Sequence, residues 1–180
     1  MRMTATDEDL ARAAANGDGE AFSRLLERQY DRLFALCFRL TGTRADAEDL
    51  CQDICAALPS KLARFDGRAR VTTWLYRVAV NAAHDRRRKI ATHGRHAEGW
   101  GEWEAARQAA IAEEAERRDW LIGAMARLGD DLRDTLALML DDLTHAEAGE
   151  ILGVSEGTIS WRLAEARKKL RAMREEELSE

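Results

Sequence analysis

Apolar residues recur at helical spacing along most of the chain. Over residues 18–40 they return every three or four positions, a pattern that predicts one long amphipathic helix. Thr41 and Gly42 interrupt the pattern, and a second helix is expected over residues 44–58. Because proline has no amide hydrogen to donate, we expect Pro59 to end or kink that second helix.

The third long helix is predicted to begin with Thr72 or Thr73 as its cap and to continue to Lys89. It completes an N-terminal helical domain, assigned to residues 1–90. The apolar pattern then lapses over residues 91–114, where glycines and histidines indicate a flexible linker.

Two tryptophans, Trp100 and Trp103, lie within this linker. They either dock on another molecule or cover the N-terminal domain, and the sequence leaves both readings open. Further helices are expected over residues 111–127 and 132–143, followed by a helix-turn-helix that completes a second domain over residues 115–180. The predicted fold class is therefore all-α, with two small helical domains joined by a flexible linker.

The helix-turn-helix is the most specific feature of the sequence. From position 144 to position 171 the chain reads THAEAGEILGVSEGTISWRLAEARKKLR. Gly149 lets two helices approach closely, Gly153 permits the tight turn, and Ile159 supplies a buried aliphatic side chain. Ser155 is a natural N-cap for the helix that follows. This combination predicts a DNA-reading motif.

The second helix of the motif divides into two faces at about 100° per residue. The core face consists of Ile159, Leu163, Ala166, Leu170 and Met173. The opposite face consists of Gly157, Ser160, Trp161, Ala164, Lys168 and Arg171. Small polar and aromatic groups near the helix start would meet base edges, and the later cations would meet phosphates. The alternative is an amphipathic surface helix with solvated cations.

Composition and charge agree with this picture. The chain has 46% hydrophobic residues, 6% aromatic residues and a single proline, as expected for a helical protein. It has neither a long apolar run nor a signal peptide, so we expect a cytoplasmic protein without membrane insertion. Its net charge is −5, yet residues 61–96 hold ten cations against two anions, and residues 155–174 hold six against two. Two basic islands in an acidic background predict two contacts with DNA and weak binding by the chain alone.

The first basic island contains a second candidate DNA surface. Trp74, Arg77, Asn81, His84 and Arg88 recur at helical spacing and form one line. Aromatic rings stack on exposed bases and arginines hold the backbone, so this line is a candidate track for melted nucleic acid. In the alternative reading, the tryptophan packs on the core and the arginines are solvated.

Three stretches together resemble the extracytoplasmic-function (group IV) sigma factors, the smallest class of bacterial initiation factor. They read DAEDLCQDI at 46–54, FDGRARVTTWLYRVAVNAAHDRRRK at 65–89, and LGDDLRDTLALMLDDLTHAEAGEILGVSEGTISWRLAEARKKLR at 128–171. The resemblance covers almost the whole chain. It implies that residues 1–90 are sigma region 2, which binds the promoter −10 element and core RNA polymerase, and that residues 115–180 are sigma region 4, which reads the −35 element.

The resemblance also implies which residues make each contact. Those expected to dock on the clamp helices of core RNA polymerase are Asp46, Glu48, Asp49, Gln52 and Asp53. Those expected at the −10 element, including the capture of a flipped base, are Phe65, Arg68, Arg70, Thr72, Thr73, Trp74, Arg77, Asn81, His84 and Arg88. Those expected at the −35 element are Ser155, Glu156, Gly157, Thr158, Ser160, Trp161, Arg162, Arg167 and Lys168.

The chain departs from the family pattern at several of its positions. Pro59 stands where a tryptophan is common, and Cys55 replaces a large aromatic residue. Ser160 and Trp161 stand where many members have a lysine and a serine, which changes the expected −35 preference or makes Trp161 an inhibitor contact. Gly149 replaces the more usual alanine, at a cost to the helix of about 1 kcal/mol.

Two other classes of function fit parts of the sequence. An autonomous helix-turn-helix regulator would bind a palindromic duplex alone, and a helical adaptor would bind a partner but no DNA. We expect neither a metal nor a cofactor, because Cys37, Cys51 and Cys55 are best explained as free buried thiols and His93 and His96 lack matching ligands. The family further implies control by an anti-sigma factor, and a chain that is alone or inhibited can pack in a closed form that hides both DNA surfaces.

Overall fold

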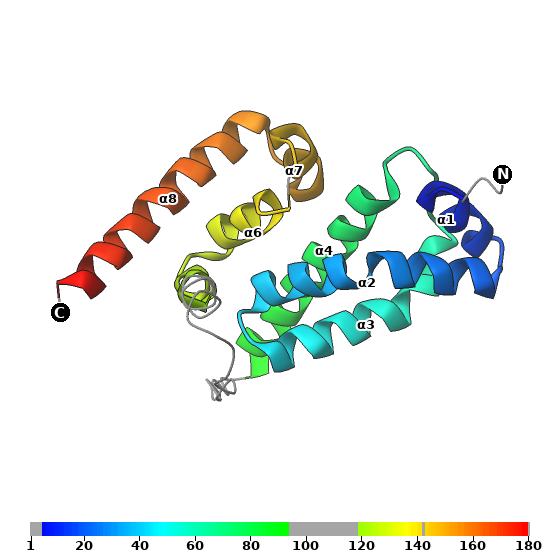
Figure 1. The fold of residues 1–180 in the computed structure, drawn as a ribbon, viewed down its shortest axis with the longest axis horizontal. Coiled ribbons are helices and arrows are strands. Elements are labelled where there is room, and N and C mark those ends of the chain that lie inside the picture. The colour runs from blue at the N-terminus through cyan, green and yellow to red at the C-terminus, as the bar shows by residue number, and fades with distance from the viewer. Residues whose placement is uncertain (1–4, 94–118, 142, 180) are drawn as a thin grey trace, which may run out of the picture.

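The computed structural model describes residues 5–93, 119–141 and 143–179, and all regular structure in these ranges is helical. The first domain consists of α1 (Asp7–Ala15), α2 (Gly19–Thr41), α3 (Arg44–Leu62) and α4 (Val71–His93) (Figure 1). The second consists of a helical stretch at 119–126, α6 (Asp130–Met139), α7 (His145–Leu152) and α8 (Glu156–Leu178). The predicted all-α fold with two helical domains is confirmed.

Helix α1 was not anticipated from the apolar pattern. Thr6 and Asp9 form a capping box, in which the Asp9 amide donates to the Thr6 hydroxyl at 3.1 Å and the Thr6 amide donates to the Asp9 carboxylate at 3.2 Å. The helix buries Leu10 and Ala11, and Arg28 of α2 donates to Asp7 at 2.9 Å. The capping box is a sequence signature of a helix start and could have revealed α1.

Helix α2 has the range predicted for the first long helix, and α3 extends beyond the end predicted for the second. The Asp18 side chain accepts hydrogen bonds from the first turn of α2, and Gly42 ends the helix in the left-handed conformation at φ 84°. The expectation that Pro59 ends α3 is wrong, because the helix continues to Leu62. Pro59 is exposed while Leu62 is buried, so packing of the last turn offsets the missing backbone hydrogen bond.

Helix α4 begins earlier than expected, and the prediction of a threonine cap is wrong. The helix starts at Val71, the Trp74 amide donates to the Arg70 carbonyl at 3.0 Å, and Thr73 is only 3% exposed. The buried side of α4 is wide, because it includes Tyr76 and Val80 as well as Val71, Leu75 and Ala79. This width follows from packing on two sides, against α2 and α3 and against α7.

The C-terminal domain is built around α6. Residues 132–138 of that helix are all buried, and it packs on α7 and α8 as well as on α2 of the first domain. It ends at Met139, four residues before the predicted end, because the chain must turn into α7. The predicted linker from residue 94 onward, with Trp100 and Trp103, and the first part of the helix expected at 111–127 lie outside the described residues.

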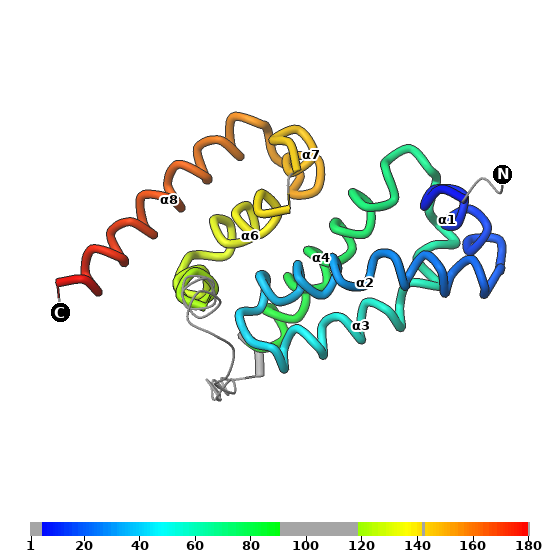
Figure 2. Tube along the Cα trace, in the orientation of Figure 1, coloured from blue at the N-terminus to red at the C-terminus, as the bar shows by residue number. Residues whose placement is uncertain are grey.

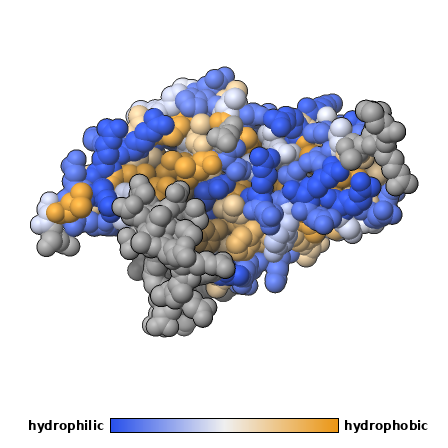
Figure 3. Space-filling model, viewed as in Figure 1, coloured by the Kyte–Doolittle hydropathy of each residue, from blue (hydrophilic) through white to orange (hydrophobic). Residues whose placement is uncertain are grey.

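The two domains lie against each other (Figure 2), and one cluster of buried side chains extends through both. At the seam, a Cβ atom on Gly42 would lie 3.3 Å from the Cβ of Ala126. Figure 3 shows that the surface over α1 to α3 is mostly hydrophilic and that apolar residues gather between α6 and α8. None of the helices in the described ranges has the length and apolar character needed to cross a membrane.

Candidate nucleic-acid interface

The helix-turn-helix has the local geometry that its sequence predicts. Thr144 and Glu147 form a capping box at the start of α7, with amide-to-side-chain distances of 2.9 and 3.2 Å. Gly153 ends α7 in the left-handed conformation at φ 68°. The Ser155 hydroxyl then accepts from the Thr158 amide at 3.2 Å, which starts α8. Each cap satisfies backbone groups that the helix ends leave open.

Gly149 explains how closely the motif is folded. A Cβ atom at this position would lie 2.7 Å from the carbonyl oxygen of Val154 in the turn, and 3.8 Å from Ile159, which is fully buried. The contact is with backbone, so a side chain could be accommodated only by moving the turn. The departure from the family's alanine therefore has a steric reason in this chain.

Helix α8 presents one face to solvent and one to the core, as predicted. Ile159, Leu163 and Ala166 are buried. The exposed residues of the predicted −35 set are Ser155, Glu156, Gly157, Ser160, Trp161, Arg167 and Lys168, with Thr158 half-buried. Basic and polar groups thus line the side of α8 that faces away from the domain.

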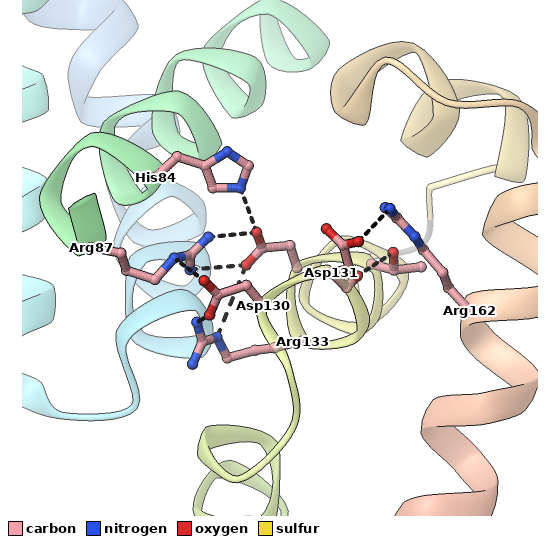
Figure 4. Close-up of polar contacts among 8 residues, drawn as sticks. His84, Arg87, Asp130, Asp131, Arg133 and Arg162 are labelled. Carbon is pink, nitrogen blue, oxygen red and sulfur yellow. Dashed lines mark hydrogen bonds and ion pairs between the residues drawn. The ribbon is translucent and has the colours of Figure 1, made fainter. Parts of the chain in front are cut away.

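Arg162 differs from the rest of that set. Its guanidinium donates to Asp131 of α6 at 2.7 Å, and its side chain is only 14% exposed (Figure 4). In this structure the arginine therefore holds α8 on α6 instead of facing a groove.

The middle of the predicted −10 surface is occupied by the second domain. Asp134 of α6 accepts from His84 Nε2 at 2.6 Å and from the two terminal nitrogens of Arg87 at 2.6 and 3.1 Å (Figure 4). Arg87 Nε also lies 3.3 Å from Asp130. The Asp134 side chain is 2% exposed, so this carboxylate is buried by its partners from the other domain.

Two arginines of the predicted −10 set hold carboxylates of α7, whereas Arg87 was not among the predicted contacts. Arg77 donates to the Glu150 side chain at 2.9 Å and to its backbone carbonyl at 3.1 Å, and Arg70 lies 3.2 Å from Glu147. The Thr144 backbone amide and hydroxyl, together with Arg70, hold the pKa of Glu147 below its usual value. The cations predicted to contact DNA phosphates therefore contact acidic side chains of the same chain.

A polar contact also lies within the seam, at Asp141. Its carboxylate accepts a short hydrogen bond from Tyr76 of α4 and lies 3.6 Å from Arg39 of α2. Burial lowers the pKa of Arg39, and Asp141 opposes that effect. Sequence reasoning missed this group and Asp134, because nothing in the local spacing indicates that side chains of α4 reach α6 and the turn after it.

The remaining residues of the predicted −10 set are divided between core and surface. Trp74 packs on Phe65 with ring centroids 5.2 Å apart, and Thr73 is buried, so neither side chain stands free in this structure. Thr72 is half-buried. The other members, Arg68, Asn81 and Arg88, are exposed; Arg68 lies 3.4 Å from Asp66, and Arg88 donates to Asp85. The structure therefore splits the predicted line instead of presenting it as one track.

The acidic side of α3 remains accessible. Glu48, Asp49, Gln52 and Asp53 are exposed. Asp46 is half-buried and, although burial opposes it, hydrogen bonds from Arg86 at 2.7 Å and from Thr43 lower its pKa. This surface is available to a partner while the two domains are in contact.

The three cysteines are free thiols in the interior of the first domain. Cys37 and Cys51 are buried and Cys55 is half-buried. A hydrogen bond with Cys37, reinforced by burial, raises the pKa of Cys51 to about 11, so this thiol is a poor nucleophile. The described ranges contain no cluster of ligands suited to a metal ion.

Comparison with known proteins identifies the two domains. The family model of sigma-70 region 2 matches residues 25–92, and that of sigma-70 region 4 matches residues 124–172. The region 4 match falls within the predicted residues 115–180, and the region 2 match ends two residues past the predicted boundary at 90. The boundaries themselves stay predictions.

Whole-chain relatives agree. The extracytoplasmic-function (ECF) RNA polymerase sigma factor SigM of Mycobacterium tuberculosis is 31% identical over 94% of this chain and 85% of its own length. SigW of Bacillus subtilis is 29% identical over 86% of this chain and 89% of its own length.

Solved structures show the same fold. CnrH in complex with the cytosolic domain of CnrY matches with a TM-score of 0.70 and 25% identity, over 94% of this chain and 97% of that one. RpoE of Bartonella quintana, in complex with the anti-sigma factor NepR, matches with a TM-score of 0.67 and 21% identity, over 87% and 98%. The chain belongs to the sigma-70 family and, within it, to the extracytoplasmic-function sigma factors.

Proposed function

We propose that this sigma factor directs core RNA polymerase to its promoters through two DNA contacts, region 2 at the −10 element and region 4 at the −35 element, without catalysing a reaction itself. The observation that carries the proposal is the α7–α8 motif, whose caps, turn and exposed basic face are those of a major-groove reader.

The polymerase contact is proposed for the acidic side of α3. Asp49 and Asp53 are exposed and lie one turn apart with Gln52 between them, so they offer carboxylates and an amide to a basic partner surface. The two domains do not cover this side, so polymerase can engage it before they separate.

The −10 contact requires a change in domain arrangement. Arg77 and Arg87 cannot hold DNA phosphates while they hold Glu150 and Asp134. We therefore propose that the structure is a resting form in which acidic side chains of region 4 occupy the phosphate positions of region 2. Polymerase binding would supply the free energy that separates the domains.

An anti-sigma factor is the proposed regulator of this step. CnrH and RpoE, which share the fold, were solved with the cytosolic domain of CnrY and with the anti-sigma factor NepR. A protein that binds the resting form more tightly than the open one would shift the chain toward the resting form, and that difference in affinity is the proposed means of control.

Run-off transcription tests the proposal. The template is the promoter of the chain's own operon, with purified bacterial core polymerase present or absent. We expect a discrete transcript that needs both proteins. Exchanging Asp49 and Asp53 for alanine should lower the yield by weakening polymerase binding, whereas Asp31→Ala on the exposed side of α2 is the matched control.

Other outcomes identify the competing functions. Tight binding of a palindromic duplex without polymerase, and no transcript, would establish an autonomous helix-turn-helix regulator. Failure to bind DNA and failure to co-purify with core polymerase would establish an adaptor. Either result contradicts the proposed function.

A further inference from the structure

The side chain of Trp161 stands out on the recognition helix. It is 64% exposed, in the second turn of α8. Its neighbours one turn before and one turn after, Gly157 and Ala164, have little or no side chain to cover the ring. In the described part of the chain nothing hydrogen-bonds to the indole or stacks on it. A large apolar ring that is exposed to water at this position indicates that another molecule binds against it.

The position of the ring favours DNA over a protein as that occupant. Trp161 shares the outward face of α8 with Ser160, whose hydroxyl is within 3.0 Å of His145 Nδ1 and of the Glu156 carbonyl. Ser160 is therefore held by its own domain, which leaves the indole as the largest group directed outward. Further along the same helix, Arg167, Lys168 and Arg171 are exposed, and such a row of cations suits a phosphate backbone.

The chemistry of the ring indicates what it reads. The major groove offers one apolar feature, the C5-methyl group of thymine, and the other base edges present donors and acceptors that an aromatic face leaves unpaired. We propose that Trp161 is a specificity-determining residue of the −35 contact and selects thymine by packing against its methyl group. The inference rests on the proposed function, because it requires α8 to lie in a promoter groove.

The first test uses the full chain with core polymerase on promoters whose −35 region is randomised, each variant being linked to its own barcode downstream of the start site, and the run-off transcripts are counted by sequencing that barcode. The wild-type chain should enrich thymine at one position on the order of fivefold, within the usual discrimination for one base pair. Trp161→Ser should lose that preference and keep the others. Lys168→Ala is the matched control: it should lower all transcripts and leave every base preference intact.

The second test removes only the methyl group. Replacing the selected thymidine by deoxyuridine should weaken wild-type binding about fourfold, the contribution expected of one buried methyl group. The Trp161→Ser chain should not distinguish the two templates. Since Trp161 is exposed, this variant is expected to fold, and unchanged thermal unfolding verifies it.

Three outcomes would overturn the inference. Identical base preferences in wild-type and Trp161→Ser chains would mean that the ring reads nothing. An equal response of both chains to deoxyuridine would assign the methyl contact elsewhere. If the library yields no transcript even with the wild-type chain, the proposed function fails and this inference fails with it.

Discussion

The two basic surfaces of this protein are in opposite states. On α8, Arg167 and Lys168 stand in solvent beside an uncovered tryptophan. On α4, Arg77 and Arg87 are paired with carboxylates of the other domain. The same chain thus displays its proposed −35 surface and shields its proposed −10 surface. The difference shows that the acidic background of the sequence is a specific internal partner for one of the two basic islands.

Burial makes the ion pairs between the two domains unequal in strength. The pairs formed by Arg70 and Arg77 are largely exposed and contribute little, as surface ion pairs do. Asp134 is different, because its carboxylate is removed from water and two side chains of α4 hydrogen-bond to it. The stability of the resting form therefore depends mainly on the buried carboxylate of Asp134, on the half-buried carboxylate of Asp141 and on the apolar seam around them.

The largest effect is expected for Asp134→Ala. Removing the carboxylate leaves Arg87 without its main partner, and loss of one member of a buried pair costs roughly 3–5 kcal/mol. Chemical denaturation should show that loss, and small-angle X-ray scattering should show a larger radius of gyration. Asp131→Ala is the matched control, since Asp131 also lies on α6 but is exposed and pairs within its own domain. Equal effects of both changes would contradict a special role for Asp134.

A smaller effect, confined to region 4, is expected for Gly149→Ala. The added methyl group would lie 2.7 Å from a backbone carbonyl, and overpacking of this kind costs about 1–3 kcal/mol. Thermal unfolding measures the loss. Gly157→Ala serves as the control, because its Cβ has room and alanine favours a helix. A stabilised Gly149→Ala chain would show that the turn adapts freely.

The exposed ion pair between Arg77 and Glu150 tests whether acidic side chains of region 4 compete with DNA for region 2. Glu150→Gln releases Arg77 from its ion pair and should raise transcription, by at most about fivefold for a surface pair. Arg77→Ala should lower it, because the same guanidinium is then missing from the −10 contact. If both changes lower transcription equally, Glu150 supports the fold and does not compete with promoter DNA.

The smallest effect is a pH dependence at Glu147. The folded state holds the pKa of this carboxyl below its usual 4.5, so its stabilising contribution is present above that pH and is lost as the pH falls through the folded value. The difference in unfolding free energy between wild type and Glu147→Gln should therefore shrink below pH 4.5. A difference that stays constant down to pH 3 would show that the charge contributes nothing.

The contrast between the surfaces also shows what the sequence can predict. The cap at Ser155, the turn at Gly153 and the buried stripe of α8 follow from local spacing, and the structure has all of them; the capping box at Thr144 was not predicted. The continuation of α3 through Pro59 could not be foreseen, because it depends on packing of the last helical turn.

The same distinction applies to the site. The acidic side of α3 and the exposed face of α8 follow from helical periodicity alone. The hydrogen bond between His84 and Asp134 joins residues that are 50 positions apart in the chain, and spacing does not predict it. Periodicity indicates which side of a helix is polar. It carries no information about which distant polar residues that side contacts.

A reversible lock across the seam tests the central claim most directly. With Gly42→Cys and Ala126→Cys, the two Cβ atoms lie near 3.3 Å, close to the roughly 3.5–4.5 Å that a disulfide spans. The native thiols compete poorly, being largely buried. Run-off transcription is then compared with the disulfide formed and after reduction, with Gly42→Cys alone as control for backbone strain at φ 84°.

If the −10 surface must be uncovered for initiation, the oxidised double variant is inactive and reduction restores its transcript, while the single variant is indifferent to the redox state. An oxidised, fully cross-linked chain that still initiates from the promoter would contradict the account, because the domains would then work without separating.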